Sequence, residues 1–234
     1  MYKRAVILAG GKGTRLKPYT ISLPKPLVPI GEMPVIEIII RQLVNNGFEH
    51  ITITINHMAD IIKAFCGNGE KWNVKIDYSL EDKPLSTMGP LKLIKDLPDN
   101  FLIMNGDVLS NMNYAELYAN HIVNKNIFTV SSYRRDYKID YGVLDIGSNN
   151  KLNSFIEKPV IPYNVSMGIY MANIAVLKHI PSNVPYGFDN LMLDLIAAKN
   201  PASIHKFDGY WLDIGRPDEY EKACVDFEKG LINI

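Results

Sequence analysis

The sequence lacks the features that mark several broad classes of protein. Its 234 residues include only two cysteines, Cys66 and Cys224, too few for a disulfide framework or a zinc cluster. Basic and acidic residues number 25 each, so no overall field attracts the chain to nucleic acid or an anionic membrane. The apolar stretch of residues 35–40 contains Glu37 and is far too short to span a bilayer. We therefore expect a soluble cytoplasmic protein that holds any phosphate ligand by local groups.

Apolar runs and turn residues predict strands and helices that alternate along the chain. The run from Ala5 to Ala9 leads into glycines, as in a buried strand that ends in a tight loop. Isoleucines alternate with threonines over residues 51–55, which is typical of a strand. Further strands are expected at residues 74–78, 101–104, 127–133 and 168–171 and near 143 and 155, and helices at 34–43, 59–65, 90–95, 114–125, 188–198 and 217–229.

This order of elements predicts the fold class. Strands that alternate with helices form an α/β fold, here a Rossmann-like domain with a mostly parallel mixed sheet and helices on both faces. No linker, repeat or low-complexity tract divides the chain, so residues 1–234 are expected to form one domain. Ligands of such sheets bind outside the carboxyl ends of the strands.

The first predicted strand ends in a glycine-rich turn, GGKGTR, at residues 10–15. Glycines allow the backbone to approach a ligand, and amides in such a turn can hold phosphate oxygens. Arg15 adds a planar group that binds phosphate in a bidentate manner. The turn is neither a Walker loop nor the dinucleotide fingerprint, because Leu16 stands where the latter has glycine. Alone, it is either a phosphate-binding loop or only a tight turn.

Longer segments carry a family resemblance. Residues 8–18 (LAGGKGTRLKP) and 23–30 (LPKPLVPI) resemble the signature of the sugar-1-phosphate nucleotidyltransferases, also called nucleotide-sugar pyrophosphorylases. Further blocks follow in the family's order: EDKPL (81–85), NGD (105–107), YGV (141–143), EKP (157–159), GIY (168–170) and WLDIG (211–215). Residues 79–91 are most similar to mannose-1-phosphate and heptose-1-phosphate guanylyltransferases. The resemblance implies an enzyme that joins a nucleoside triphosphate to a sugar 1-phosphate and releases pyrophosphate.

The resemblance also implies roles on the triphosphate side. Arg15 and Lys25 would be the catalytic cations, acting on the triphosphate and the departing pyrophosphate. Asp107 and Asp213 would bind Mg²⁺, which takes carboxylate and phosphate oxygens and often only one or two protein ligands. A lone aspartate after a strand can equally serve as a turn former. The expected nucleotide-binding residues are Leu8, Gly10, Gly11, Gly13, Thr14, Glu81, Pro84, Ser86 and Asp107.

Glu81 stands where the family reads the base. A carboxylate can accept both the N1–H and N2–H donors of guanine, whereas uracil and thymine offer one donor on that edge. GTP is therefore favoured, and UTP, CTP and dTTP remain alternatives. Ser86 and Met88 depart from the pattern, which usually has glycine and alanine there.

The sugar-phosphate side is expected to include Gly142, Glu157, Lys158 and Ser166. Lys158 resembles the lysine that holds the sugar phosphate, and Glu157 would accept hydrogen bonds from sugar hydroxyls. Gly142 would let the sugar ring lie against the backbone. Ser166 replaces an asparagine common before the GIY block, so the identity of the sugar stays open. His57, at the start of a predicted helix, is interpreted as structural.

Two other functions compete with this hypothesis. A glycosyltransferase could share the sheet and a metal-binding aspartate, but it does not need the glycine-rich turn with Lys25. A non-catalytic nucleotide-sugar-binding regulatory subunit would be free to lose the cations and metal ligands, which are all present. Because the sequence stops soon after residues 211–215, we expect no C-terminal left-handed β-helix domain. The expected partners are a nucleoside triphosphate and a sugar 1-phosphate, without nucleic acid or membrane, and a homo-oligomer is left open.

Overall fold

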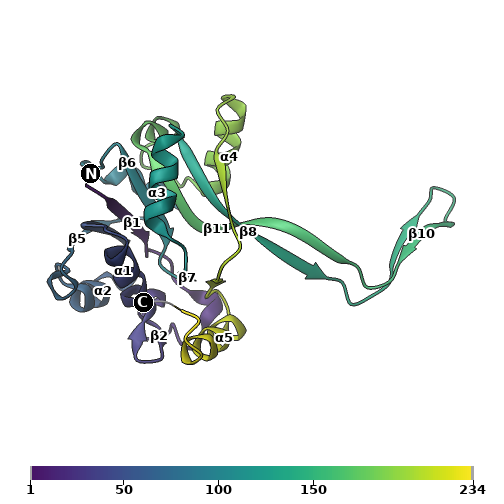
Figure 1. The fold of residues 1–234 in the computed structure, drawn as a ribbon, viewed down its shortest axis with the longest axis horizontal. Helices are drawn as coiled ribbons and strands as arrows, with labels where there is room; N and C mark the ends of the chain where they lie inside the picture. The colour runs from purple at the N-terminus through teal and green to yellow at the C-terminus, as the bar shows by residue number, and fades with distance from the viewer. Residues whose placement is uncertain (1, 233–234) are drawn as a thin grey trace.

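The computed structural model describes residues 2–232 and is built around a seven-stranded sheet (Figure 1). Its strand order is β12-β8-β11-β6-β1-β4-β5. The strands β1, β4, β5 and β6 are mutually parallel, β11 is antiparallel to its neighbours β6 and β8, and β12 is parallel to β8. These strands are β1 (Arg4–Leu8), β4 (His50–Ile55), β5 (Lys75–Leu80), β6 (Asn100–Asn105), β8 (Phe128–Lys138), β11 (Val160–Asn173) and β12 (Ser203–Phe207).

Side chains from alternate positions of the central strands enter two separate cores, one on each face of the sheet. In β1, Ile7 joins the core that includes residues of α1 (Val35–Asn45), α2 (Ala59–Cys66), α3 (Tyr114–Val123) and α5 (Pro217–Glu228). Val6 joins the other core, with residues of the 3₁₀ helices η4 (Gly89–Leu93) and η5 (Ile174–His179) and of α4 (Phe188–Ala197). The predicted α/β class, with a mostly parallel sheet covered on both faces, is confirmed.

Most expected elements are present, with boundaries shifted by a few residues. The segment predicted as a helix at 90–95 is instead the 3₁₀ helix η4, which has Pro90 in its first turn. The short strands β7 (Val108–Ser110), β12 and β13 (Trp211–Asp213) were not predicted, because segments this short carry little periodicity of their own. No helix within residues 2–232 is long and apolar enough to cross a membrane.

The largest departure from expectation concerns β8 and β11, which continue beyond the sheet as a two-stranded ribbon (Figure 1). The ribbon is paired from Ser132 opposite Ser166 out to Lys138 opposite Val160. Its far end carries a second hairpin, made of β9 (Val143–Ile146) and β10 (Leu152–Ile156). We call residues 134–164 the arm. None of them is buried, and the arm projects away from the rest of the molecule.

Candidate active site

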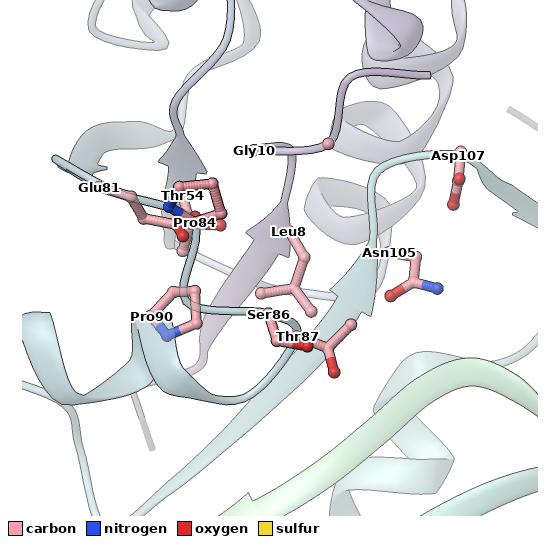
Figure 2. A pocket seen from close by; sticks show the side chains of 11 residues that line it. Leu8, Gly10, Thr54, Glu81, Pro84, Ser86, Thr87, Pro90, Asn105 and Asp107 are labelled. Carbon is pink, nitrogen blue, oxygen red and sulfur yellow. The ribbon is translucent and has the colours of Figure 1, made fainter. Parts of the chain in front are cut away.

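The carboxyl ends of four parallel strands meet at one edge of the sheet, where ligands of such folds bind. Leu8 ends β1, Thr54 lies near the end of β4, Glu81 follows β5 and Asp107 follows β6. Together with neighbouring residues they enclose a cavity of about 320 Å³ (Figure 2). The residues that line it are Leu8, Gly10, Gly11, Thr54, Glu81, Pro84, Ser86, Thr87, Pro90, Asn105 and Asp107.

Most of the predicted nucleotide-binding residues line this cavity, the exceptions being Gly13 and Thr14. The cavity has two ends in the view of Figure 2: Glu81 lies on one side, Asp107 on the other, and Leu8 between them. The sequence had not pointed to Thr54, Thr87, Pro90 or Asn105 as lining residues. Asn105 belongs to the quoted NGD block, which was the one available signal for it.

Glu81 is buried at its end of the cavity, with 7% of the residue exposed. Its Oε2 accepts a hydrogen bond from the backbone N–H of Leu85 at 3.0 Å, and its carbonyl accepts one from the side-chain amide of Asn56 at 2.7 Å. A Cβ added at Gly10 would lie 2.6 Å from Oε1, so the carboxylate needs a glycine at that position. Burial raises the pKa of Glu81, and the Leu85 amide opposes part of that rise.

Ser86, one of the two departures from the family pattern, has an unusual backbone conformation. Its φ is 64°, in the left-handed region that favours glycine. A non-glycine residue there carries about 1–2 kcal/mol of steric strain. The glycine usual in the pattern is therefore the residue that this turn geometry favours.

The two predicted cations approach the other end of the cavity from different segments. Lys25, in the 3₁₀ helix η2 (Lys25–Leu27), forms an ion pair with Asp107. The glycine-rich turn packs against Lys25, because a Cβ at Gly13 would lie 3.1 Å from the Cβ of Lys25. Arg15 is exposed in the preceding 3₁₀ helix, η1 (Thr14–Leu16). A Cβ at Gly215 would lie 3.6 Å from Nη2 of Arg15, which places this guanidinium beside the loop after β13.

Asp213 is brought next to Asp107 by the pairing of β13 with β7, in which Asp213 lies opposite Val108. The backbone N–H of Ile214 donates to the carbonyl of Asp107 at 2.9 Å. Burial, together with the negative charge of Asp107, raises the pKa of Asp213 to about 6. Oδ1 of Asp107 is buried and has no hydrogen-bond partner within residues 2–232. Two neighbouring carboxylates with an unsatisfied oxygen fit a shared divalent cation.

The donor set restricts which cation would suit the site. Among the residues that the structure describes, no group of three or more His, Cys, Asp or Glu side chains could hold a metal ion. A pair of carboxylates is nevertheless sufficient for Mg²⁺, which usually completes its shell with substrate phosphates and water. The Asp107–Asp213 pair therefore fits a magnesium ion that is bound together with a triphosphate.

The structure separates the predicted sugar-phosphate residues into two groups. Ser166 lines a cleft of about 290 Å³ that also contacts Asn105, Arg135 and Asp213, and its hydroxyl lies 3.0 Å from that of Tyr170. The other three lie on the arm, away from both cavities (Figure 1).

Those three residues are close to one another. A Cβ at Gly142 would lie 3.2 Å from Oε2 of Glu157, and Glu157 pairs with Lys158 at 3.9 Å. The side chains of Glu157 and Lys158 are 60% and 56% exposed. Their sugar-binding role stays a prediction.

Known proteins resemble this chain in both sequence and structure. Mannose-1-phosphate guanyltransferases of Schizosaccharomyces pombe and Aspergillus oryzae are 34% and 33% identical to it over 93% of its length. The chain spans 62% of the length of each of these relatives. The solved structure of HddC from Yersinia pseudotuberculosis, complexed with GMP-PN, superposes with a TM-score of 0.71 and 28% identity, covering 97% of this chain and all of that one. The family model described as "Nucleotidyl transferase" matches residues 4–230, and the chain belongs to that family.

Proposed function

We propose that this chain transfers GMP from GTP to a sugar 1-phosphate, giving a GDP-sugar and pyrophosphate. The observation that carries the proposal is the buried carboxylate of Glu81 in a cavity whose other end is lined by Asp107, with Lys25 and Asp213 beside that aspartate. A nucleotide that spans the cavity would have its base at Glu81 and its phosphates near the cations. The names of the curated relatives, mannose-1-phosphate guanyltransferases, support the same reaction.

Guanine suits the Glu81 end of the cavity because of its donors. Oε2 of Glu81 accepts the backbone N–H of Leu85, while Oε1 faces Gly10. A carboxylate has capacity for about four accepted bonds, so the Leu85 bond leaves room for the N1–H and N2–H donors of guanine. The absence of a Cβ at Gly10 leaves Oε1 accessible.

The chemistry is an in-line displacement at the α-phosphorus. An oxygen of the sugar phosphate forms a bond to this phosphorus, the bond to the β-phosphate breaks, and pyrophosphate leaves with the electron pair. Lys25 and Arg15 stabilise the negative charge that moves towards the leaving group. Enzymes of this family generally use divalent metal ions. We assign Mg²⁺ to Asp107 and Asp213, where it would supply positive charge to the phosphate oxygens.

Mannose 1-phosphate is the first sugar to test, since the curated relatives carry its name. Ser166 is assigned to the sugar side, because its cleft also contacts Asp213. The neutral charge and the two free cysteines are in keeping with a catalytic domain of residues 1–234 that works in the cytoplasm.

The test is a matrix of five triphosphates (GTP, UTP, CTP, ATP and dTTP) against several sugar 1-phosphates, scored by pyrophosphate release with Mg²⁺. The expected result is the fastest release with GTP, first with mannose 1-phosphate. Faster release with UTP, CTP or dTTP would overturn the assignment of GTP and leave the transferase reaction in place. Nucleotide binding without pyrophosphate release for every combination would favour a non-catalytic binding subunit.

A further inference from the structure

The arm holds Glu157 and Lys158 far from the cavity of their own chain. The ribbon is paired without interruption from Ser132 opposite Ser166 to Lys138 opposite Val160. At a rise of about 3.3 Å per residue, those six steps place the end of the ribbon roughly 20 Å beyond Ser166. Glu157 and Lys158 lie past that end, beside the outer hairpin (Figure 1). One chain therefore cannot bring them to its own Asp213 while the arm keeps this direction.

The direction of the arm is set by packing at its base. The register of β11 against β8 shifts between Ser166 and Tyr170, and Gly168 in that bulge has a φ of 72°. The bulge is buried: Met167 is 1% exposed and accepts a hydrogen bond from the indole of Trp211 at 3.0 Å. A Cβ at Gly168 would lie 2.6 Å from the side-chain amide of Asn105. The base is thus a packed bend and not a free hinge.

The outer part of the arm, residues 139–160, lines neither the nucleotide cavity nor the cleft at the base of the arm, and none of these residues is buried. A two-stranded ribbon alone is at best marginally stable in water, and large exposed apolar surfaces mark interaction sites. A standard interface takes about 20–30 residues from each partner, which the arm (residues 134–164) can supply. Its exposed large apolar residues are Tyr137, Tyr141, Val143, Leu144, Ile146, Leu152, Phe155, Ile156, Val160, Ile161 and Tyr163.

The cleft in the body of the molecule contains only one of the four predicted sugar-phosphate residues. The cleft between the base of the arm and Asp213 opens beside the nucleotide cavity, and Ser166 is the one predicted sugar-phosphate residue that lines it. The other three predicted sugar-phosphate residues gather on the arm. One chain thus contains both the cleft and the arm residues, but the direction of the arm keeps them apart. If two copies exchange arms reciprocally, the arm of each copy can reach the cleft of the other, and the dimer has closed two-fold symmetry.

We infer that two copies of this chain exchange arms, so that the arm of one copy completes the sugar 1-phosphate site of the other. The inference rests on the proposed function and names the source of three residues in that site. Gly142, Glu157 and Lys158 then act on the sugar phosphate held at the partner's Asp107 and Asp213. The exposed apolar residues of the arm are covered by the partner's body in the same step.

A complementation experiment tests the exchange. One chain carries Asp107→Ala and an intact arm, and the second carries Glu157→Ala and Lys158→Ala with an intact body. Each homodimer should lose at least 100-fold in turnover. The two chains are then co-expressed with different tags and the heterodimer is isolated on both tags. It contains one site with an intact body and an intact arm, so we expect half of the wild-type turnover per dimer.

Sedimentation of the wild-type protein should show a dimer, and replacing residues 140–158 by a two-residue turn should give a folded monomer. Asp145→Asn with Lys151→Ala, in the same outer hairpin, is the control and should leave turnover and dimerisation unchanged. Any of three results would overturn the exchange. The wild type could sediment as a monomer, or the chain with Glu157→Ala and Lys158→Ala could keep its turnover. The third result is an active wild type together with a heterodimer that is as inactive as each parent homodimer. Failure of the proposed function is seen separately, as a wild-type dimer that releases no pyrophosphate.

Discussion

Replacing Glu81 with glutamine exchanges one acceptor oxygen in the cavity for an NH₂ group and leaves the volume of the side chain almost unchanged. Oε2 of Glu81 accepts the backbone N–H of Leu85 at 3.0 Å. In glutamine the side-chain carbonyl keeps this bond, so the NH₂ group takes the place of Oε1. That group would face the N1–H and N2–H donors of guanine, and donors do not bond to donors.

The size of the effect follows from the burial of Glu81, which is 7% exposed. A hydrogen-bonding group left unsatisfied in such a place costs about 1–3 kcal/mol. Since a factor of ten corresponds to about 1.4 kcal/mol, the preference for GTP should fall by roughly 5- to 150-fold. Preference here means the ratio of kcat/KM for GTP to that for each other triphosphate.

The assay is pyrophosphate release with all five triphosphates, for the wild type and Glu81→Gln. Asp82→Asn is the matched control: it removes one negative charge from the exposed neighbouring residue and should keep the preference. Gly10→Ala should also weaken it, because its Cβ would lie 2.6 Å from Oε1 of Glu81. In a double variant with Glu81→Gln, Gly10→Ala should lower the GTP preference little further, since both changes act on the Glu81 side chain. An unchanged GTP preference in Glu81→Gln would refute the reasoning.

Three further predictions concern the metal, the fold and pH. Asp213→Ala should lower turnover at least 100-fold with unchanged circular dichroism, and EDTA should abolish wild-type turnover until Mg²⁺ is restored; full activity in Asp213→Ala without metal would contradict the site. Gly31→Ala should lower the free energy of unfolding by about 2 kcal/mol or more, because φ is 60° and its Cβ would lie 2.4 Å from the ring of Phe227. Gly230→Ala, where φ is 68° and an added Cβ would meet no neighbouring atom of residues 2–232 within 4 Å, should cost less in the same denaturant titration. Burial lowers the pKa of His121 to about 4 from 6.5, so the unfolded chain takes up its proton first, and stability should fall by up to roughly 3 kcal/mol from pH 6.5 to 4. His121→Leu should flatten that slope, and an unaltered slope would show that other groups cause it.

Local sequence patterns were sufficient to predict much of the fold and to place the glycine-rich turn and Asp107 at the ligand-binding edge of the sheet. The helix predicted at 34–43 is α1, and the alternating isoleucines and threonines of 51–55 form β4, because periodicity reports which face of an element is buried. The carboxyl-end rule for parallel strands was enough to expect the glycine turn and Asp107 near one ligand. Glu81 required the family resemblance, since a lone glutamate before Asp82 carries no signal of burial.

What the sequence by itself determined is the order of most strands and helices, since their periodicity depends on neighbours within about one helical turn. Its family resemblance also supplied the candidate residues for binding phosphate, base and metal. The tertiary structure decided which strands lie side by side. That choice adds Thr54 to the cavity wall and, through the pairing of β13 with β7, places Asp213 beside Asp107. It also decided that β8 and β11 continue into an arm that carries Glu157 away from the cavity. A strand's alternation is the same inside a sheet and beyond its edge, so only contacts between residues distant in sequence could distinguish the two.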